Sequence, residues 1–292
     1  MRILLTGGSG FIGKNIRESW ASLHEVSAPA HQELDLTDAE AVRAFFRGKA
    51  FDAVIHTAVR PGHRNAADPS RQIEINTRMF FNLIRNQERF RKMVVLSSGL
   101  VYDQRNYRPK MREDDFDTHV PLDDGGFSKY LIAKHIQFLD NVVELRPFGV
   151  FGKYEDYTIR FISNAICRTL FDLPITLRRN RRFDYIWVND LMPVLEFFIG
   201  HDAKHRSYNV TPDEPVELLT MAQKVQKLSG KDLPILVGEA GMGVEYSGSN
   251  ARLKEEMREL KFTPTGEAVE RLYEWYQTQR SSIRKEDLLV DR

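Results

Sequence analysis

The sequence predicts an α/β protein in which helices cover both faces of a parallel β-sheet. Short apolar segments suited to buried strands alternate with amphipathic segments suited to helices, and the first strand leads directly into a glycine-rich turn. Residues 3–5 and 93–96 are continuous apolar runs, which is typical of strands that are buried on both faces. The alternation therefore indicates a doubly wound parallel sheet.

The first half of the chain supplies the elements of this sheet in order. The turn after the first strand leads into a helix whose apolar face carries Ile12, Ile16 and Trp20. Thr37 or Asp38 can cap the next helix, which we expect to reach about residue 46. The other expected strands lie near residues 24–28, 51–55, 93–96 and 142–146, and the other expected helices span about 73–88 and end near 140.

After Pro147 the alternation of strands and helices becomes less regular. We expect this part of the chain to form a smaller α/β lobe that binds the substrate. We expect residues 1–150 to form the first lobe, to which later segments can return, and residues 151–279 to form mainly the second. Residues 280–292 are charged and lack apolar periodicity, so a solvated tail is expected. The expected helices of the second lobe lie near 159–170, 190–199, 217–228 and 266–279, and short strands lie near 175–177 and 185–187.

The composition favours a small-molecule ligand over a macromolecular one. The 292 residues include 42 Lys and Arg and 41 Asp and Glu, which gives a net charge of +1. Such a charge does not attract the protein to nucleic acid or to an anionic membrane, so we expect neither of them as a partner. Cys167 is the single cysteine, and no apolar run is long enough for a signal peptide or a membrane span, so we expect a cytoplasmic protein.

The turn after the first strand has the glycine spacing of a dinucleotide-binding loop. Gly7, Gly10 and Gly13 stand three residues apart between a strand and a helix. Such glycines allow a tight turn, a close approach of the backbone to a pyrophosphate, and close packing of the helix on the strand. The sequence therefore predicts a Rossmann-type first lobe that binds NAD or NADP.

Several further motifs, taken together, resemble the extended short-chain dehydrogenase/reductase superfamily, whose NAD-dependent epimerase/dehydratase members act on nucleotide sugars. The motifs are the Gly7-x-x-Gly10-x-x-Gly13 turn, the segments at 56–59, 97–102 and 145–152, and an asparagine in a helix. The resemblance runs along nearly the whole chain. The residues that it implies in cofactor binding are Gly7, Gly10, Phe11, Ile12, Gly13, Asp35, Leu36, Thr57, Ala58, Asn76, Ser97, Lys129 and Pro147.

The end of the second expected strand favours NADP over NAD. An acidic residue there would accept hydrogen bonds from the ribose 2′-hydroxyl and repel a 2′-phosphate. Residues 26–31 contain no carboxylate, which first appears at Glu33. His31 is a candidate neighbour of the phosphate, although a plain surface histidine is an equally good interpretation.

The resemblance implies a catalytic tyrosine, a lysine four residues later on the same helix face, and a serine that orients the substrate oxygen. Ser98 is the candidate serine. Two alignments of the sequence with the family pattern, here called registers, give different residues for the tyrosine and the lysine. Tyr130 and Lys134 have the spacing, but the longer family pattern Y-G-x-S-K aligns with residues 125–129, which places Lys129 at the lysine and Gly125 at the tyrosine. Because Lys129 falls early in the expected helix, the Lys129 register is favoured.

A glycine at position 125 leaves three interpretations open. Tyr130 or another group substitutes for the missing phenol, the chain is an altered or inactive variant, or the protein binds the cofactor without turnover. We retain Ser98, Lys129 and Tyr130 as candidate catalytic residues. For Tyr130, a packed aromatic on the helix surface is the better interpretation.

Among the reactions of this superfamily, the sequence favours reduction of a nucleotide-linked 4-keto-sugar. Gly99 and Leu100 lack the acid pair that a sugar dehydratase needs for elimination. A 4-epimerase and a non-catalytic dinucleotide-binding protein remain alternatives. Ser98 and Gly99 are expected to contact the substrate, and Arg182 is the candidate ligand of its phosphates, one place earlier than the family pattern has its arginine. No metal-binding spacing occurs, and the oligomeric state is left open, with a homodimer as the assembly to test.

Overall fold

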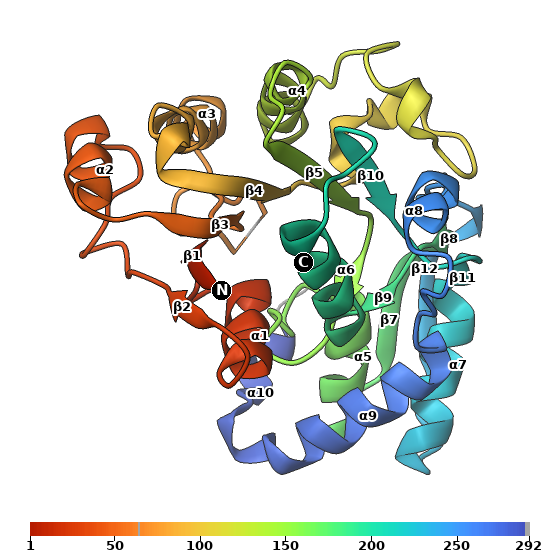
Figure 1. The fold of residues 1–292 in the computed structure, drawn as a ribbon. Helices are drawn as coiled ribbons and strands as arrows, with labels where there is room; N and C mark the ends of the chain where they lie inside the picture. Colours follow the sequence, from red (N-terminus) through yellow and green to blue (C-terminus); the bar gives the residue numbers. More distant parts are fainter. Residues whose placement is uncertain (64, 290–292) are drawn as a thin grey trace.

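The computed structural model describes residues 1–63 and 65–289. Within them, parallel strands form one sheet in the order β10-β5-β4-β3-β1-β2 (Figure 1). The strands are β1 (Arg2–Thr6), β2 (Glu25–Ser27), β3 (Phe51–His56), β4 (Phe90–Leu96), β5 (Val142–Pro147) and β10 (Ser207–Val210). The strand order reverses at β1, because β2 lies on one side of β1 and β3 on the other. Sheets of this class bind ligands at the carboxyl ends of the strands, near the point where the strand order reverses.

Helices cover both faces of this sheet, as expected from the alternation (Figure 1). Ile3 and Leu5 of β1 pack toward α1 and α6, whereas Leu4 packs toward the opposite face. This division follows from the alternation of side chains along a strand. One face is covered by α1 (Phe11–Trp20) and α6 (Leu191–Gly200), and the other by α2 (Ala39–Phe46), α3 (Gln72–Ile84) and α4 (Asp124–Ile136).

Later parts of the chain complete the first lobe. The strand β10 pairs in parallel with β5, so that Tyr208 lies opposite Leu145. The helix α8 (Ala251–Glu256) places Leu253 in the same core cluster as α6 and β10. Neither β10 nor α8 was expected from the sequence, because both are too short to show a clear period.

The second lobe has a core of its own, built mainly from helices (Figure 1). Its helices are α5 (Phe161–Leu170), α7 (Leu218–Ser229) and α9 (Thr265–Thr278). Its strand pairs are β6 (Val150–Phe151) with β9 (Ile186–Trp187), β7 (Ile175–Asn180) with β12 (Ile235–Met242), and β8 (Arg182–Phe183) with β11 (Val216–Glu217). Short 3-10 turns occur at η1 (Gln87–Arg89), η2 (Gly99–Val101), η3 (Gln104–Asn106), η4 (Glu113–Asp115), η5 (Val188–Asp190) and η6 (Arg280–Ser282).

The prediction of a solvated tail is wrong for residues 280–289. This segment forms η6 and the helix α10 (Lys285–Leu289) and buries Ile283 and Leu288 in the core of the second lobe. The guanidinium of Arg168 donates a hydrogen bond of 2.7 Å to the backbone oxygen of Leu288. Ile283 and the short apolar run that begins at Leu288 are separated by four charged residues, so the sequence gave no periodic signal of this docking. Residues 290–292 lie outside the described residues.

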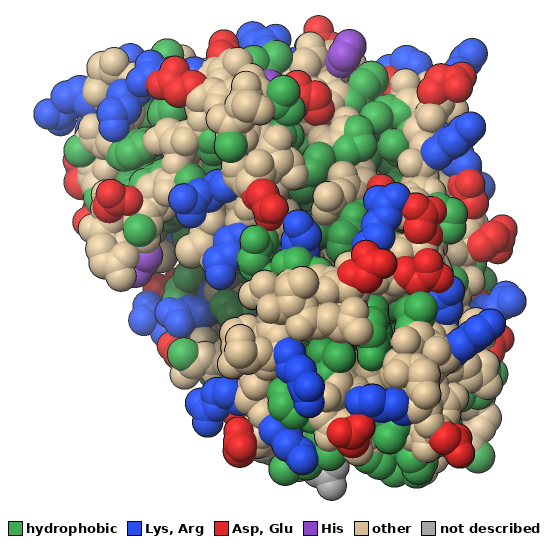
Figure 2. Space-filling model, turned by 90° about the horizontal axis from the view of Figure 1, so that it is seen from below, with side chains coloured by type: hydrophobic (Ala, Val, Ile, Leu, Met, Phe, Trp, Pro, Cys, Tyr) green, Lys and Arg blue, Asp and Glu red, His purple; other side chains and the backbone are tan. Residues whose placement is uncertain are grey.

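The surface mixes charges of both signs. On the face shown in Figure 2, acidic and basic side chains are interspersed, with hydrophobic side chains between them. This agrees with the net charge of +1. Over the part of the chain that the structure describes, no helix combines the length and the apolar character that a bilayer crossing requires.

We predict that Leu288→Ala lowers the free energy of unfolding by about 2 to 4 kcal/mol, because it leaves a cavity under α10. Leu288 is 2% exposed, whereas its neighbour Leu289 is 58% exposed. The matched control Leu289→Ala should therefore change the free energy by less than about 0.5 kcal/mol. Urea unfolding of both variants measures the difference, and equal small effects would show that the segment does not dock in solution.

Candidate functional site

The glycine turn between β1 and α1 is packed too closely for side chains. Gly7 has a φ of +73°, and a Cβ atom there would lie 2.6 Å from Thr57 Oγ1 and 2.7 Å from Ala58 N. A Cβ atom at Gly13 would lie 2.2 Å from the backbone oxygen of Gly7. Gly10 is the N-cap of α1 and offers no side-chain acceptor to the N–H groups of the first turn. These N–H groups are therefore available to an anion at the positive end of the helix.

The end of β3 is tied to this turn. Thr57 donates to the backbone oxygen of Thr6 through its N–H, at 3.3 Å, and through its hydroxyl, at 2.7 Å. His56 is buried and shares a 2.7 Å hydrogen bond with the Thr6 hydroxyl. Burial lowers the pKa of His56 to about 4, and the charge of Lys129 acts in the same direction. His56 is therefore a neutral structural residue at the floor of the site.

Asn76 connects the segment after β3 to the helix α4. Its Oδ1 accepts the N–H of Arg60 at 2.7 Å, and its Nδ2 donates to Ser128 Oγ at 3.3 Å. Ser128 in turn donates to the backbone oxygen of Gly125 at 2.8 Å. Asn76 is 5% exposed, so these bonds fix the beginning of α4 against the sheet.

The ammonium of Lys129 and the hydroxyl of Ser97 have no hydrogen-bond partner in the described part of the chain. Among the hydrogen bonds of the described residues, none involves the ammonium of Lys129, and the hydroxyl of Ser97 is buried without a partner. Burial lowers the pKa of Lys129, and the carboxylate of Glu144 opposes this change. Since buried polar groups are normally paired, both residues fit a bound ligand at the carboxyl ends of β4 and β5.

The side chains of Tyr130 and Lys134 do not point to the group formed by Lys129 and Ser97. Both bind Asp117 instead. The Tyr130 hydroxyl donates to Asp117 Oδ1, and Lys134 Nζ lies 2.6 Å from Asp117 Oδ2. The hydrogen bond to Asp117, with burial, raises the pKa of Tyr130 to about 12. A catalytic tyrosine needs the opposite change. Since consecutive residues on a helix point about 100° apart, the structure does not bring Tyr130 together with Lys129.

Gly125 lies in the first turn of α4, which Asp123 caps by accepting the N–H of Gly126 at 2.7 Å. A Cβ atom at Gly125 would lie 3.1 Å from Gln72 Oε1 and 3.4 Å from Asp123 Oδ1. The side chain of Gln72, from the start of α3, therefore lies beside the place where the family pattern has its phenol. Sequence reasoning missed Gln72, because only the tertiary packing of α3 on α4 brings it there.

Ser98 caps the turn η2, and Gly99, the next residue, lies against a group of aromatic rings. Ser98 Oγ accepts the N–H of Leu100 at 3.3 Å, which caps the turn η2. A Cβ atom at Gly99 would lie 2.7 Å from the Phe148 ring and 2.8 Å from the Tyr246 hydroxyl. We call the rings of Tyr107, Phe148, Phe183 and Tyr246 the aromatic cluster; neighbouring rings in it lie 4.8 to 5.2 Å apart.

The structure places Arg181, rather than Arg182, at the aromatic cluster. The guanidinium of Arg181 lies 5.1 Å from the centre of the Phe183 ring, whereas Arg182 is exposed and faces Glu217 at 4.0 Å. Arg181 and Arg160 both act electrostatically on Tyr246, whose pKa is raised chiefly by burial. Arg181 lies between β7 and the two-residue strand β8, so the sequence offers no period that indicates which of the two arginines reaches Phe183.

The remaining predicted cofactor residues fix the backbone around the site. Asp35 Oδ1 accepts the N–H and the hydroxyl of Thr37 at 2.8 and 2.7 Å; burial opposes ionisation, but these hydrogen bonds hold the pKa of Asp35 below its usual value. Leu36 is buried in the core. Pro147 ends β5 opposite Val210 of β10, and Phe11 and Ile12 begin α1.

These features define a dinucleotide-binding protein of the Rossmann type. The family model for the "NAD dependent epimerase/dehydratase family" matches residues 3–211. A GDP-L-fucose synthase of Azorhizobium caulinodans is 37% identical over 112 residues, which cover 35% of this chain but only 34% of that relative. A GDP-L-colitose synthase of Yersinia pseudotuberculosis is 32% identical over 70% of this chain and 74% of the relative.

Solved structures show the same fold. The GDP-mannoheptose C4 reductase of Campylobacter jejuni, with NADP bound, superposes with a TM-score of 0.81 over 94% of this chain and 98% of that one, at 18% identity. The chain belongs to the NAD-dependent epimerase/dehydratase family, a family of enzymes. Its cofactor is therefore NAD or NADP, and the glycine turn, Ser97 and Lys129 are the residues that fit it.

Proposed function

We propose that the protein is an NADP-dependent reductase that converts the 4-keto group of a nucleotide-linked sugar into a hydroxyl group. The observation that carries the proposal is Lys129, whose ammonium has no acceptor in the described part of the chain and which shares a helix face with Gly125 one turn earlier. When bound, the cofactor supplies the hydride. The sugar-nucleotide enzymes to which the chain is similar support the substrate class.

The aromatic cluster and its two arginines suit such a substrate. Aromatic rings pack against the faces of a sugar or a base, and guanidinium groups pair with the oxygens of a diphosphate. Arg181 lies over Phe183, and Arg160 carries the second charge near Tyr246. We therefore assign phosphate binding to Arg181 and Arg160 in place of Arg182.

We assign the proton transfer to Lys129. Gly125 offers no phenol, and the hydroxyl of Tyr130 is held by Asp117. As hydride reaches the carbonyl carbon, the ammonium of Lys129 gives a proton to the carbonyl oxygen, which the hydroxyl of Ser98 orients. Lys129 becomes a neutral amine and regains its proton from water. Burial lowers the pKa of Lys129, which makes the ammonium a stronger acid.

The activity itself is tested by mixing the protein with NADPH and GDP-, UDP- or dTDP-linked 4-keto-6-deoxysugars. We expect at least one of these compounds to cause loss of the nicotinamide absorbance of NADPH and a matching gain of two hydrogens in the sugar by mass spectrometry. No loss with any of them would contradict the reductase and favour a dinucleotide-binding protein without turnover.

A 4-epimerase is the second candidate, favoured by the family to which the chain belongs. Such an enzyme returns the hydride to the same substrate and keeps its cofactor bound between turnovers. The two are distinguished by the nucleotide released on denaturing the purified protein. Stoichiometric NAD would favour the epimerase.

We predict that Lys129→Arg loses turnover by about 100-fold or more while still binding NADPH, because arginine keeps the charge but does not release a proton at neutral pH. For the wild type, kcat should fall as the pH rises through the pKa of Lys129, since the protonated form is the acid. Steady-state kinetics and calorimetry measure turnover and binding separately.

The variant Gly125→Tyr provides the control for this assignment. Its phenol should restore turnover in the Lys129→Arg background, because the tyrosine then donates the proton. If Lys129→Arg alone keeps full turnover, Lys129 is not the acid.

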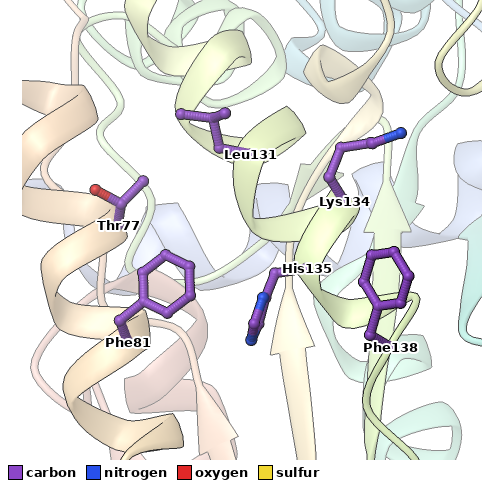
Figure 3. A pocket seen from close by; sticks show the side chains of 6 residues that line it. All are labelled: Thr77, Phe81, Leu131, Lys134, His135 and Phe138. Atoms are coloured by element: carbon purple, nitrogen blue, oxygen red, sulfur yellow. The ribbon is translucent and has the colours of Figure 1, made fainter.

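We also propose that the protein forms a homodimer through a groove between α3 and α4. The groove has a volume of about 420 Å³ and is lined by Thr77 and Phe81 on α3, by Leu131, Lys134 and His135 on α4, and by Phe138. Figure 3 shows Phe81 of α3 and His135 of α4 pointing toward each other, and their rings lie 4.9 Å apart. Phe138 is 80% exposed at the rim of the groove. A protruding ring beside an apolar hollow is self-complementary, as a twofold interface requires.

We predict that Phe138→Asp converts this dimer to a monomer, because it places a charge in the apolar contact. Sedimentation velocity measures the assembly. Leu23, which is 63% exposed after α1, provides the control Leu23→Asp, which should remain dimeric. A monomeric wild type would overturn the proposed assembly.

We propose a cytoplasmic location as well. The thiol of Cys167 is buried and unpaired, which a reducing compartment permits. The net charge of +1 favours neither nucleic acid nor an anionic membrane as a partner.

A further inference from the structure

The side chain of Gln72 lies between two glycines that come from different segments. Gln72 is the first residue of α3, and a Cβ atom at Gly62 would lie 2.3 to 2.5 Å from the atoms of its amide group. A Cβ atom at Gly125, in the first turn of α4, would lie 3.1 Å from its Oε1 atom. A side chain at Gly62 would displace the amide. The loop after β3 and the start of α4 therefore enclose it from two sides.

Half of the hydrogen-bonding capacity of this amide is unused. Gln72 Nε2 donates one of its two N–H groups to the backbone oxygen of Pro69 at 3.1 Å, which orients the amide. In the part of the chain that the structure describes, its side chain makes no other hydrogen bond, and it is only partly buried. The neighbouring carboxylate of Asp123 accepts the N–H of Gly126 and the side-chain amide of Gln104 instead. The second N–H group of Gln72 is therefore free to bind a ligand.

The amide borders the helix face that carries Lys129. Gly125 and Lys129 are four residues apart on α4, so they share this face. In the family pattern, a phenol at position 125 both donates a hydrogen bond to the substrate oxygen and gives it a proton. Gly125 can do neither. An amide donates hydrogen bonds but is no acid at neutral pH, so Gln72 can supply only the first of these two functions.

We propose that the free N–H group of Gln72 donates a hydrogen bond to the carbonyl oxygen of the sugar and stabilises the charge that develops on this oxygen. A donor that is held in place before the reaction acts most strongly in the transition state, when the carbonyl oxygen becomes an alkoxide. Gln72 keeps both of its protons, since the proton comes from Lys129. The inference rests on the proposed reductase, and it divides the two functions of the missing phenol between Gln72 and Lys129.

Kinetics of the full-length protein with NADPH and the 4-keto-6-deoxysugars named above test the inference. Gln72→Met and Gln72→Glu keep the length of the side chain but remove the donor at neutral pH. Each should lower kcat by about 100-fold, the usual effect of removing one donor to a developing oxyanion, and leave the affinity for NADPH unchanged within about twofold. Gln72→Glu also places a negative charge one helical turn from Lys129. The fall of kcat with rising pH should therefore move to higher pH in this variant.

The control Gln87→Met removes an exposed glutamine beyond the other end of α3, and it should leave kcat and the unfolding temperature unchanged. Full turnover of both Gln72 variants would overturn the inference. So would a loss of kcat that is accompanied by weaker NADPH binding, a lower unfolding temperature and an unmoved pH profile in Gln72→Glu, because these would show a merely structural role.

Calorimetry separates a failure of this inference from a failure of the proposed reductase. The same sugars are titrated into protein saturated with NADP⁺, which has no hydride to give. Gln72→Met should weaken their binding by about 3- to 10-fold, the value of one neutral hydrogen bond, and an unchanged affinity would overturn the inference. A wild type that binds a sugar but reduces none contradicts the reductase alone. A wild type that binds none of them overturns both.

Discussion

The buried ion pair between Glu144 and Arg146 on β5 ties together the chain segments at one end of the sheet. Their side chains are 1% and 2% exposed and lie 2.7 Å apart. Arg146 also donates to the Tyr102 hydroxyl at 3.1 Å, and Tyr102 donates to Asn209 of β10 at 2.8 Å. Removing one partner of such a pair typically costs about 3 to 5 kcal/mol, because the other charge stays buried. The pair thus fixes the segment after Ser98 between β5 and the returning strand.

The same carboxylate also acts on the charge of Lys129. Glu144 Oε1 is buried without a hydrogen bond in the part of the chain described, and its charge favours the protonated form of Lys129. Burial of Lys129 acts against protonation, and His56 beside it stays neutral. Burial and the charge of Glu144 therefore act in opposite directions on the pKa of Lys129, and burial is the larger effect. Under the proposed mechanism, this lowered pKa helps Lys129 to give its proton to the substrate.

The fold and the cofactor loop could be predicted from the sequence because their signals are local. A strand, three spaced glycines and an amphipathic helix stand next to each other, and alignment of residues 125–129 indicated Lys129 over Lys134. The return of β10 to the sheet and the position of Gln72 could not be predicted, since both depend on contacts between distant segments. The contact of Arg181 with Phe183 could not be predicted either, because a two-residue strand shows no period in the sequence. The docking of Leu288 was missed for the same reason.

Gly125 lies inside a helix, where glycine is unfavourable, and the packing around it does not require a glycine. A glycine inside a helix costs about 1 kcal/mol relative to alanine, and α4 has two of them in its first turn. Gly126 is sterically required, because a Cβ atom there would lie 2.7 Å from the backbone oxygen of Leu100. At Gly125 the nearest atom is the far end of the flexible Gln72 side chain at 3.1 Å, so a larger residue would fit after a small shift. The fold therefore does not demand this glycine. What it provides is a position without a side chain one helical turn before Lys129, bordered by the flexible side chain of Gln72.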